Sequence, residues 1–245
     1  MTMSAQTLIV NLKAWRGMIG KGWGPGAIET RDGWLNRLIT ELEEDYEASE
    51  LKILSNEHLN PAGKMSAIRD LGTRFLPTVA WLKTAATRLE GEDKGFQTRL
   101  YAVKSPIKDN ELRREQRNGE IRSLLVGHNQ AERDTQFLLA AEHDHDEVLD
   151  AMLDSPMGPM VSEEMKQRAL DARAKRQQPN DYAAFEQNTL LLEYVHMLRD
   201  LIGRRLYSIG VDAAKIKDVL GVTVAREEEV RRPPVTAEQY VGVSK

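Results

Sequence analysis

Residues 30–54, TRDGWLNRLITELEEDYEASELKIL, carry the apolar periodicity of a helix. The spacing of three and four residues puts the large apolar side chains on one face: Leu35, Leu38, Ile39, Leu42 and Tyr46. The opposite side is acidic, with Glu41, Glu43, Glu44, Asp45, Glu47 and Glu50. We therefore predict an amphipathic helix over 30–54, whose apolar stripe packs against a helical neighbour.

The segment that follows is predicted to supply this neighbour. Asn60-Pro61 is a helix start signal, because it places a capping side chain before a proline at the first helical position. Apolar residues then recur as in a coiled-coil seam, at Met65, Ile68, Phe75, Val79, Leu82, Ala86 and Leu89. Gly72 interrupts the seam, and Pro77 is expected to kink the helix. The helix ends near Gly91 and Gly95 or continues to about Lys104.

Shorter helices are predicted from 109 to 221. Asp109 or Asn110 caps the first, and Asn129 with Glu132 forms a capping box for the second, which bends near His143 into a further helix. Ser162 caps the next, and Pro179 with Asp181 opens the most apolar one. A last short helix is expected over 211–220.

The two ends of the chain differ from this middle. Residues 4–19 are moderately amphipathic, and the glycines and proline of 20–26 are expected to exclude any regular element. From 222 the chain is polar, and Arg231-Arg232-Pro233-Pro234 excludes helix. We predict an all-α fold with an N-terminal helix and glycine-rich loop (1–28), a kinked long-helix hairpin (29–108), a bundle of short helices (109–221) and an extended C-terminal arm (222–245).

The composition excludes several classes of function. The 245 residues include no cysteine, which excludes disulfides, thiolate catalysis and Cys-bound metals. The net charge of −4 argues against a dominant nucleic-acid surface. The apolar runs are too short to span a bilayer, and no signal peptide is recognised, so we expect intracellular synthesis. An acidic block over 29–58 precedes a basic block over 59–108, which indicates solvated helix faces or complementary contacts within the chain or between copies.

The sequence contains only weak motifs for phosphate binding, metal binding or catalysis. The glycines of 20–26 lack the Gly-Lys-Ser/Thr ending of a phosphate-binding loop. The run 142–147, EHDHDE, is rich in metal-ligating side chains, but only pairs such as His143 with Glu147, or Glu142 with Asp146, share a helix face. A helix start capped by Asp144 is the simpler interpretation, and a metal hydrolase built on His143 and His145 is the rarer one. We predict a protein that is not an enzyme and holds no cofactor or metal.

The basic block is the one candidate for contact with nucleic acid. Its residues are spread around the predicted helix, although Lys83 with Lys94, and Arg88 with Arg99, share a face. A phosphate-tracking stripe through Lys83, Arg88, Lys94 and Arg99 is therefore one interpretation. The simpler one is a solvated face that pairs with the acidic block.

Two stretches resemble small helical proteins from the virion-structure gene regions of tailed bacteriophages. The first is HLNPAGKMSAIRDLG (58–72), with its Leu-x-Pro-x-Gly-Lys helix start. The second lies within 118–160 and combines Glu-Ile-Arg, a turn, a capped Ala-Glu-Arg helix, an acidic turn and a Val-Leu-x-Ala helix before a proline loop. Its matching residues are Glu120, Ile121, Arg122, Ala131, Glu132, Arg133, Val148, Leu149, Ala151, Met152 and Pro156. The glycine-rich loop and the Arg-Pro-Pro tail fall outside the resemblance.

The resemblance implies a non-enzymatic structural or assembly protein of a phage virion, made in the host cytoplasm and present in several copies or as a homo-oligomer. Its partners would be other virion proteins. Because aromatic and arginine side chains dominate interfaces, the predicted contact residues are Trp15, Trp23, Trp34, Trp81, Arg231, Arg232 and Tyr240. For Trp34 and Trp81, ordinary packing in the core is the alternative. The alternatives are a scaffolding protein that leaves before maturation and a nucleic-acid-associated regulatory or packaging protein that uses the basic residues of 64–108.

Overall fold

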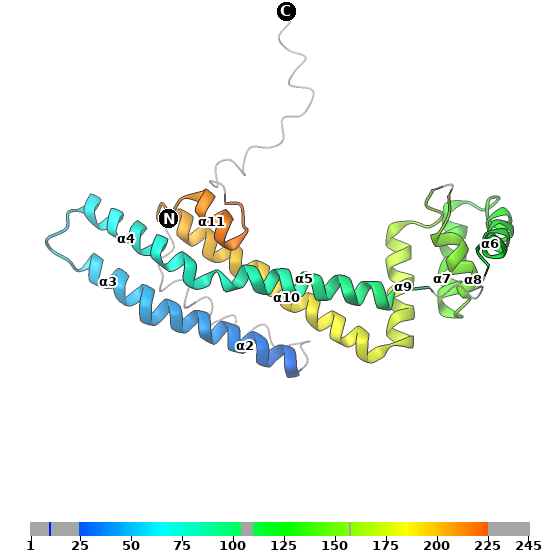
Figure 1. Cartoon of the computed structure of the whole chain (residues 1–245), viewed down its shortest axis with the longest axis horizontal. Coiled ribbons are helices and arrows are strands. Elements are labelled where there is room, and N and C mark those ends of the chain that lie inside the picture. The colour runs from blue at the N-terminus through cyan, green and yellow to red at the C-terminus, as the bar shows by residue number, and fades with distance from the viewer. Residues whose placement is uncertain (1–9, 11–24, 104–109, 157, 225–245) are drawn as a thin grey trace, which may run out of the picture. The chain divides into compact units, whose positions relative to one another are not determined.

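The structure of the chain is a computed structural model that describes residue 10 and residues 25–103, 110–156 and 158–224 (Figure 1). In these ranges the regular elements are helices and no strand occurs, which confirms the all-α prediction. No helix in the described part is both long and apolar enough to cross a membrane. The helix predicted over 4–19 and nearly all of the predicted arm lie outside the described residues.

The first described helix is continuous and changes its winding partway. It consists of α2 (Pro25–Thr40), the π-helix η1 (Glu41–Glu47) and α3 (Ala48–Leu54). It begins at Pro25, so the prediction that 20–26 contains no regular residue is wrong for Pro25 and Gly26. The reason is that proline fits the first turn of a helix, where its missing N–H has no partner to lose.

The π-helix follows from the spacing of the core positions. Leu38, Leu42, Tyr46 and Glu50 are all buried at steps of four residues. In an α-helix each such step turns the side chain about 40° further round, so Glu50 would stand about 120° away from Leu38. A π turn holds more residues than an α turn, and it therefore keeps the spacing of four on one face. The sequence pattern up to Tyr46 did not reveal this change of winding.

The second long helical segment breaks where proline was expected to break it. Helix α4 (Pro61–Phe75) is capped by Asn60, whose side chain accepts from the Gly63 amide at 2.8 Å. A 3-10 turn, η2 (Leu76–Val79), contains Pro77 and precedes α5 (Trp81–Leu100). Gly91 and Gly95 lie inside α5 and do not end it.

The contacts between residues divide the chain into two units. Unit 1 comprises Met1–Arg88 and Leu190–Lys245, and unit 2 comprises Leu89–Thr189. The chain passes between the units within α5 and within α10 (Pro179–Ser208). This grouping differs from the consecutive segments 29–108 and 109–221 predicted from the sequence, because residues at the start and the end of the chain share one core.

Unit 1 has an apolar core made by α2–α4, the second half of α10 and α11 (Ala213–Leu220). Gly72 of α4 permits close packing, since a Cβ there would lie 2.6 Å from Ile209 Cδ1 and 3.0 Å from Val211 Cγ2. Tyr46 packs edge-on against Phe75, with ring centroids 5.1 Å apart. Helix α11 begins at Ala213 and is capped by Asp212, slightly later than predicted.

Unit 2 contains four shorter helices: α6 (Glu111–Leu125), α7 (Gln130–Glu142), α8 (Asp146–Leu153) and α9 (Glu163–Gln177). Their common core is apolar and includes Leu125, Phe137, Ala140, Ala141, Leu149, Met152, Met160, Val161, Ala169 and Leu170. Three predicted N-caps are confirmed: Asn110, Ser162, and the capping box of Asn129 with Glu132.

Candidate functional site

Two of the tryptophans predicted to bind partners pack against each other in unit 1. The rings of Trp34 on α2 and Trp81 on α5 lie 6.1 Å apart and are half-buried. The Arg37 guanidinium lies 4.8 Å from the centre of the Trp81 ring, a cation–π contact. This arrangement gives both tryptophans a packing role inside the unit. The other predicted contact residues, Trp15, Trp23, Arg231, Arg232 and Tyr240, lie outside the described residues.

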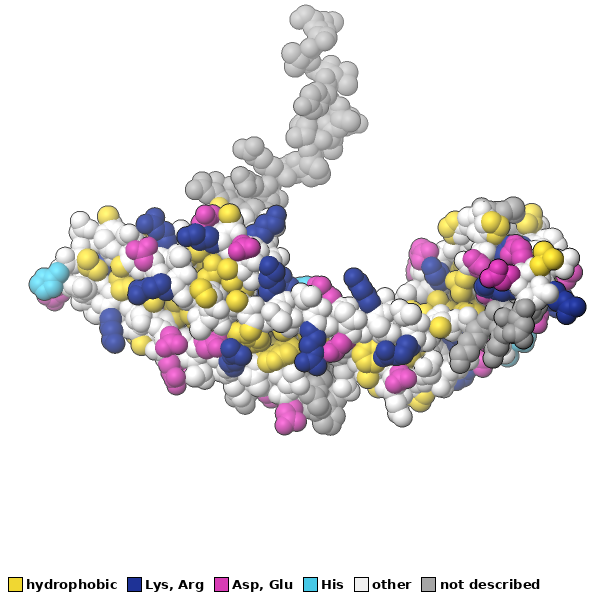
Figure 2. Space-filling view, in the orientation of Figure 1, with side chains coloured by type: hydrophobic (Ala, Val, Ile, Leu, Met, Phe, Trp, Pro, Cys, Tyr) yellow, Lys and Arg dark blue, Asp and Glu magenta, His cyan; other side chains and the backbone are white. Residues whose placement is uncertain are grey.

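The four basic residues considered for nucleic acid all lie on α5 and are exposed. Lys83 and Arg88 belong to unit 1, whereas Lys94 and Arg99 belong to unit 2. Lys83 donates to the Asp218 carbonyl at 2.6 Å, and the Arg99 guanidinium lies 4.9 Å from the centre of the Phe96 ring. Figure 2 shows positive and negative side chains interspersed on the visible face.

Pairing between the acidic block (29–58) and the basic block (59–108) was one interpretation of the sequence. The structure shows other partners for two carboxylates of the acidic block. Glu41 pairs with Arg37 of α2 at 2.9 Å, and Glu50 pairs with Arg205 of α10 at 2.6 Å. These two carboxylates thus bind arginines outside 59–108.

The carboxylates of the run 142–147 bind arginines from neighbouring helices. Asp146 accepts from Arg173 of α9 at 2.6 Å, and Glu147 pairs with Arg117 of α6 at 3.2 Å. In the described ranges, no group of three or more metal-ligating side chains could hold an ion. The run therefore acts as a set of ion-pair partners that connect α6, α8 and α9.

Asp144 does not cap α8, and the prediction that it does is wrong. His145 occupies the N-cap position without a side-chain hydrogen bond. Asp144 has a positive φ of 56°, which a short polar side chain tolerates better than most, and its carboxylate accepts from Arg176 at 2.6 Å and Gln177 at 2.7 Å. The turn between α7 and α8 is thereby attached to the end of α9.

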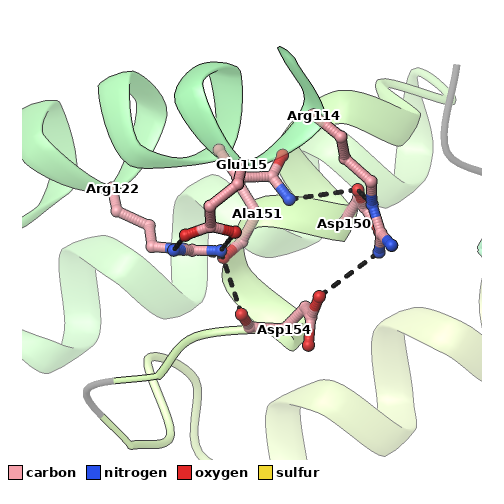
Figure 3. Close-up of polar contacts among 7 residues, drawn as sticks. Arg114, Glu115, Arg122, Asp150, Ala151 and Asp154 are labelled. Carbon is pink, nitrogen blue, oxygen red and sulfur yellow. Dashed lines mark hydrogen bonds and ion pairs between the residues drawn. The ribbon is translucent and has the colours of Figure 1, made fainter. Parts of the chain in front are cut away.

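The main polar site of unit 2 lies between α6 and α8, and we call it the α6–α8 junction: Arg114, Glu115, Asn118, Arg122, Asp150, Ala151 and Asp154 (Figure 3). Asp150 is buried and accepts three hydrogen bonds from α6. Two come from Arg114, at 2.7 Å from Nε and 2.6 Å from Nη2, and one comes from Asn118 at 3.1 Å. Such a bidentate arginine contact fixes the orientation of both side chains.

Arg122 binds the C-terminal end of α8. Its Nε donates to the Ala151 carbonyl and its Nη2 to the Asp154 carbonyl, both at 2.9 Å. Its Nη1 donates to the carboxylate of Glu115, which also belongs to α6, at 2.7 Å. Carbonyls at a helix C-terminus lack hydrogen-bond donors in their own helix and carry partial negative charge. An arginine supplies both the donors and the opposite charge.

The electrostatics of unit 2 stabilise the charged forms of these groups. The hydrogen bonds to Asp150 raise the pKa of Arg114. The Arg122 guanidinium lowers the pKa of the Glu115 carboxyl by hydrogen bonding to it. Burial would raise the pKa of Asp134, but hydrogen bonds from the Ser162 amide at 2.9 Å and hydroxyl at 2.7 Å outweigh this effect and lower it. These groups are therefore ionised partners in binding helices together at neutral pH.

Several large apolar side chains point outward. In unit 1 they gather near the turn between α3 and α4, and in unit 2 they lie mainly on α6. The residues concerned are Leu51, Leu54 and Met65 in unit 1, and Leu112, Leu124, Val126 and Leu139 in unit 2. Leu112 and Leu124 are 72% and 75% exposed, although α6 buries Asn118 and Arg122. Helix α6 thus exposes two large apolar side chains while it buries two polar side chains next to Leu125, unlike an ordinary amphipathic helix.

A hollow of about 280 Å³ lies beside the loop that follows α8. Its lining includes Met152, Leu153, Met160 and Val161, together with Glu163 and Lys166. The two charged side chains pair with each other at 3.2 Å. This lining supplies a mainly apolar surface and no arrangement of nucleophile and base.

The α6–α8 junction was not predicted from the sequence. A signal was present, because Arg114, Asn118 and Arg122 repeat every four residues and continue to Leu125, as an apolar stripe would. Comparison with protein-family models, curated proteins and solved structures gives no match for this chain.

Proposed function

We propose that the chain is a non-enzymatic structural or assembly protein of a tailed-phage virion, which binds other virion proteins through its helix faces. The resemblance of 57–72 and 118–160 to virion-region phage proteins is the source of the virion assignment. The second stretch covers the C-terminal half of α6 and all of α7 and α8, so it includes the junction residues from Asn118 onward but not Arg114 or Glu115.

The observation that carries the binding role is the exposure of two leucines on α6. Leu112 and Leu124 are exposed while the polar Asn118 and Arg122 are buried. Leu112 lies near the N-terminal end of the helix and Leu124 near its C-terminal end, about 120° apart around the helix axis. Exposed leucines on a helix whose own packing is polar are available to a partner, and apolar burial drives most protein association.

The residues of unit 2 most capable of chemistry support a non-enzymatic role. The carboxylates of Asp144, Asp146, Glu147 and Asp150 each bind an arginine. A general base or a metal ligand needs a carboxylate with free acceptor sites. Nucleic-acid binding has less support, because Lys83 and Arg99 already make contacts within the chain.

The first test is quantitative mass spectrometry of purified mature particles and precursor shells from the source phage, relative to the major capsid protein. A fixed ratio in mature particles supports a structural component. Presence in precursor shells alone supports the scaffolding alternative. Absence from both contradicts the virion proposal.

The second test addresses the binding face. A Leu112→Arg, Leu124→Arg variant should reduce incorporation into particles at least tenfold, because each substitution places a charge where an apolar contact is expected. The matched control is Thr135→Arg with Gln136→Arg, which adds the same charge at two exposed polar positions of α7, away from the leucines of α6. Equal incorporation of the leucine variant, the control and the wild type would contradict a role for this face.

A further inference from the structure

Helix α6 makes little apolar contact with the rest of unit 2. Its one buried apolar residue is Leu125, and Ile121 is half-buried. Its other buried positions are Asn118 and Arg122. The neighbouring pair α7 and α9 differs, since it contributes Phe137, Ala140, Ala141, Ala169 and Leu170 to the core.

The α6–α8 junction is also open to water at its edges. The Arg114 side chain is 35% exposed, and Glu115 and Asp154 are 59% and 65% exposed. Water and salt ions can therefore reach these groups and replace their partners one after another. Screening by salt weakens such half-exposed ion pairs, whereas it hardly affects contacts between apolar side chains.

From these observations we propose that α6 is a releasable lid on α8, attached by the α6–α8 junction and able to open while α7 and α9 remain packed. Opening exposes the face of α8 that carries Asp150 and Ala151, and it frees the buried side of α6. The proposal goes beyond the virion role, because it concerns the purified chain and holds for any partner.

The structure explains why opening would stop at α6. Helix α8 keeps a second set of contacts after α6 leaves, because Asp146 binds Arg173 of α9, and Leu149 and Met152 lie in the apolar core with Phe137. Elements with few apolar contacts and solvent-exposed polar contacts open below the free energy of global unfolding.

Hydrogen exchange measured by mass spectrometry on the full chain tests the lid. We expect the amides of 115–125 to exchange at least tenfold faster than those in the middle of α7 and α9. The exchange of α6 alone should accelerate on going from about 0.05 M to about 1 M sodium chloride, because the Debye length falls from more than 10 Å to about 3 Å. Equal exchange of all three helices, or exchange of α6 that salt leaves unchanged, would overturn the proposal.

Two variants make the test specific. Asp150→Asn weakens the bidentate contact with Arg114 and should accelerate exchange of α6 several-fold with little change in α9. The matched control is Glu147→Gln, which removes the exposed pair with Arg117 between the same two helices and should change exchange less than twofold. Acceleration of all helices to the same extent by Asp150→Asn would show that α6 does not open separately. The salt comparison on the unaltered chain tests the lid even if this variant fails to fold.

Discussion

Two arginine–carboxylate pairs of the same length connect helices in different surroundings. In unit 1, Arg205 of α10 binds Glu50 of α3 at 2.6 Å, and the side chains are only 5% and 11% exposed. In unit 2, Arg114 of α6 binds Asp150 of α8, also at 2.6 Å, with exposures of 35% and 7%. The first pair lies within an apolar interface. The second pair belongs to the polar network that makes up much of the contact between α6 and α8.

The difference shows that the distance between two charges does not determine what their pair contributes. In unit 1 both side chains are nearly buried and Tyr46, which packs on Phe75, lies beside them, so either charge left alone would be buried without a partner. In unit 2, water can solvate the edge of the network when a contact opens. The same chemistry therefore fixes one helix in place and attaches the other reversibly.

The largest expected effect is at the pair in unit 1. Glu50→Ala leaves the Arg205 guanidinium buried without its carboxylate, and we expect it to lower the free energy of unfolding by about 3–5 kcal/mol. Denaturant unfolding followed by circular dichroism measures this loss. A Glu50→Arg, Arg205→Glu exchange should recover part of it. A loss below about 1 kcal/mol would show that water reaches this pair after all.

The close packing at Gly72 should give the next largest effect. Gly72→Val adds three carbons where a Cβ alone would meet Ile209 Cδ1 at 2.6 Å, so we expect a loss of about 2–3 kcal/mol from overpacking. The control is Gly33→Ala in α2, where a Cβ meets nothing within 4 Å. Because alanine favours helix, this control should gain up to about 1 kcal/mol. Thermal unfolding of both variants makes the comparison, and equal stability would contradict the packing described here.

Removal of Arg122 tests the polar interface of unit 2. Arg122→Met retains most of the side-chain length but removes the donors to the Ala151 and Asp154 carbonyls. We expect a loss of about 1–3 kcal/mol, smaller than at Glu50, because the Asp154 and Glu115 ends of the network are open to water. Denaturant unfolding of this variant beside Glu50→Ala gives the order directly, and a larger loss at Arg122 would contradict the view that the polar interface of unit 2 contributes less than the Glu50–Arg205 pair.

The sequence predicted the helices well, since caps and prolines act locally. Asn60, Asn129 and Ser162 are caps in the structure as predicted, because each satisfies an amide two or three residues away. The π-helix at 41–47 was missed because it brings Glu50 into line with the buried apolar residues, and Glu50 binds Arg205, a residue 155 positions later in the chain. A pattern of apolar residues contains no information about such a distant partner.

The candidate site was harder to predict than the fold for a related reason. Helical stripes were predicted from apolar residues, whereas α6 packs largely through Arg114, Asn118 and Arg122. Trp34 and Trp81 were predicted as partner-binding residues with core packing as the alternative, and the structure packs them on each other. In the sequence, the packed side of α6 is marked by arginine and asparagine at helical spacing from Leu125.

The smallest expected effect is at the Tyr46 hydroxyl, which is buried beside the Glu50–Arg205 pair and finds no hydrogen-bond partner among the described residues. Tyr46→Phe should leave stability at neutral pH unchanged or raise it by up to about 1 kcal/mol, since an unsatisfied polar group is removed.

Burial raises the pKa of Tyr46 from 10.0 to about 12. The folded state therefore holds this proton where the unfolded state releases it, and the resulting stability is complete below pH 10 and is lost as the pH rises through about 12. Denaturant unfolding at about pH 8 and about pH 11 should show a smaller alkaline loss in Tyr46→Phe than in the wild type. An equal loss in both would mean that the hydroxyl is already solvated, and the apolar surroundings assigned to the Glu50–Arg205 pair would then be wrong.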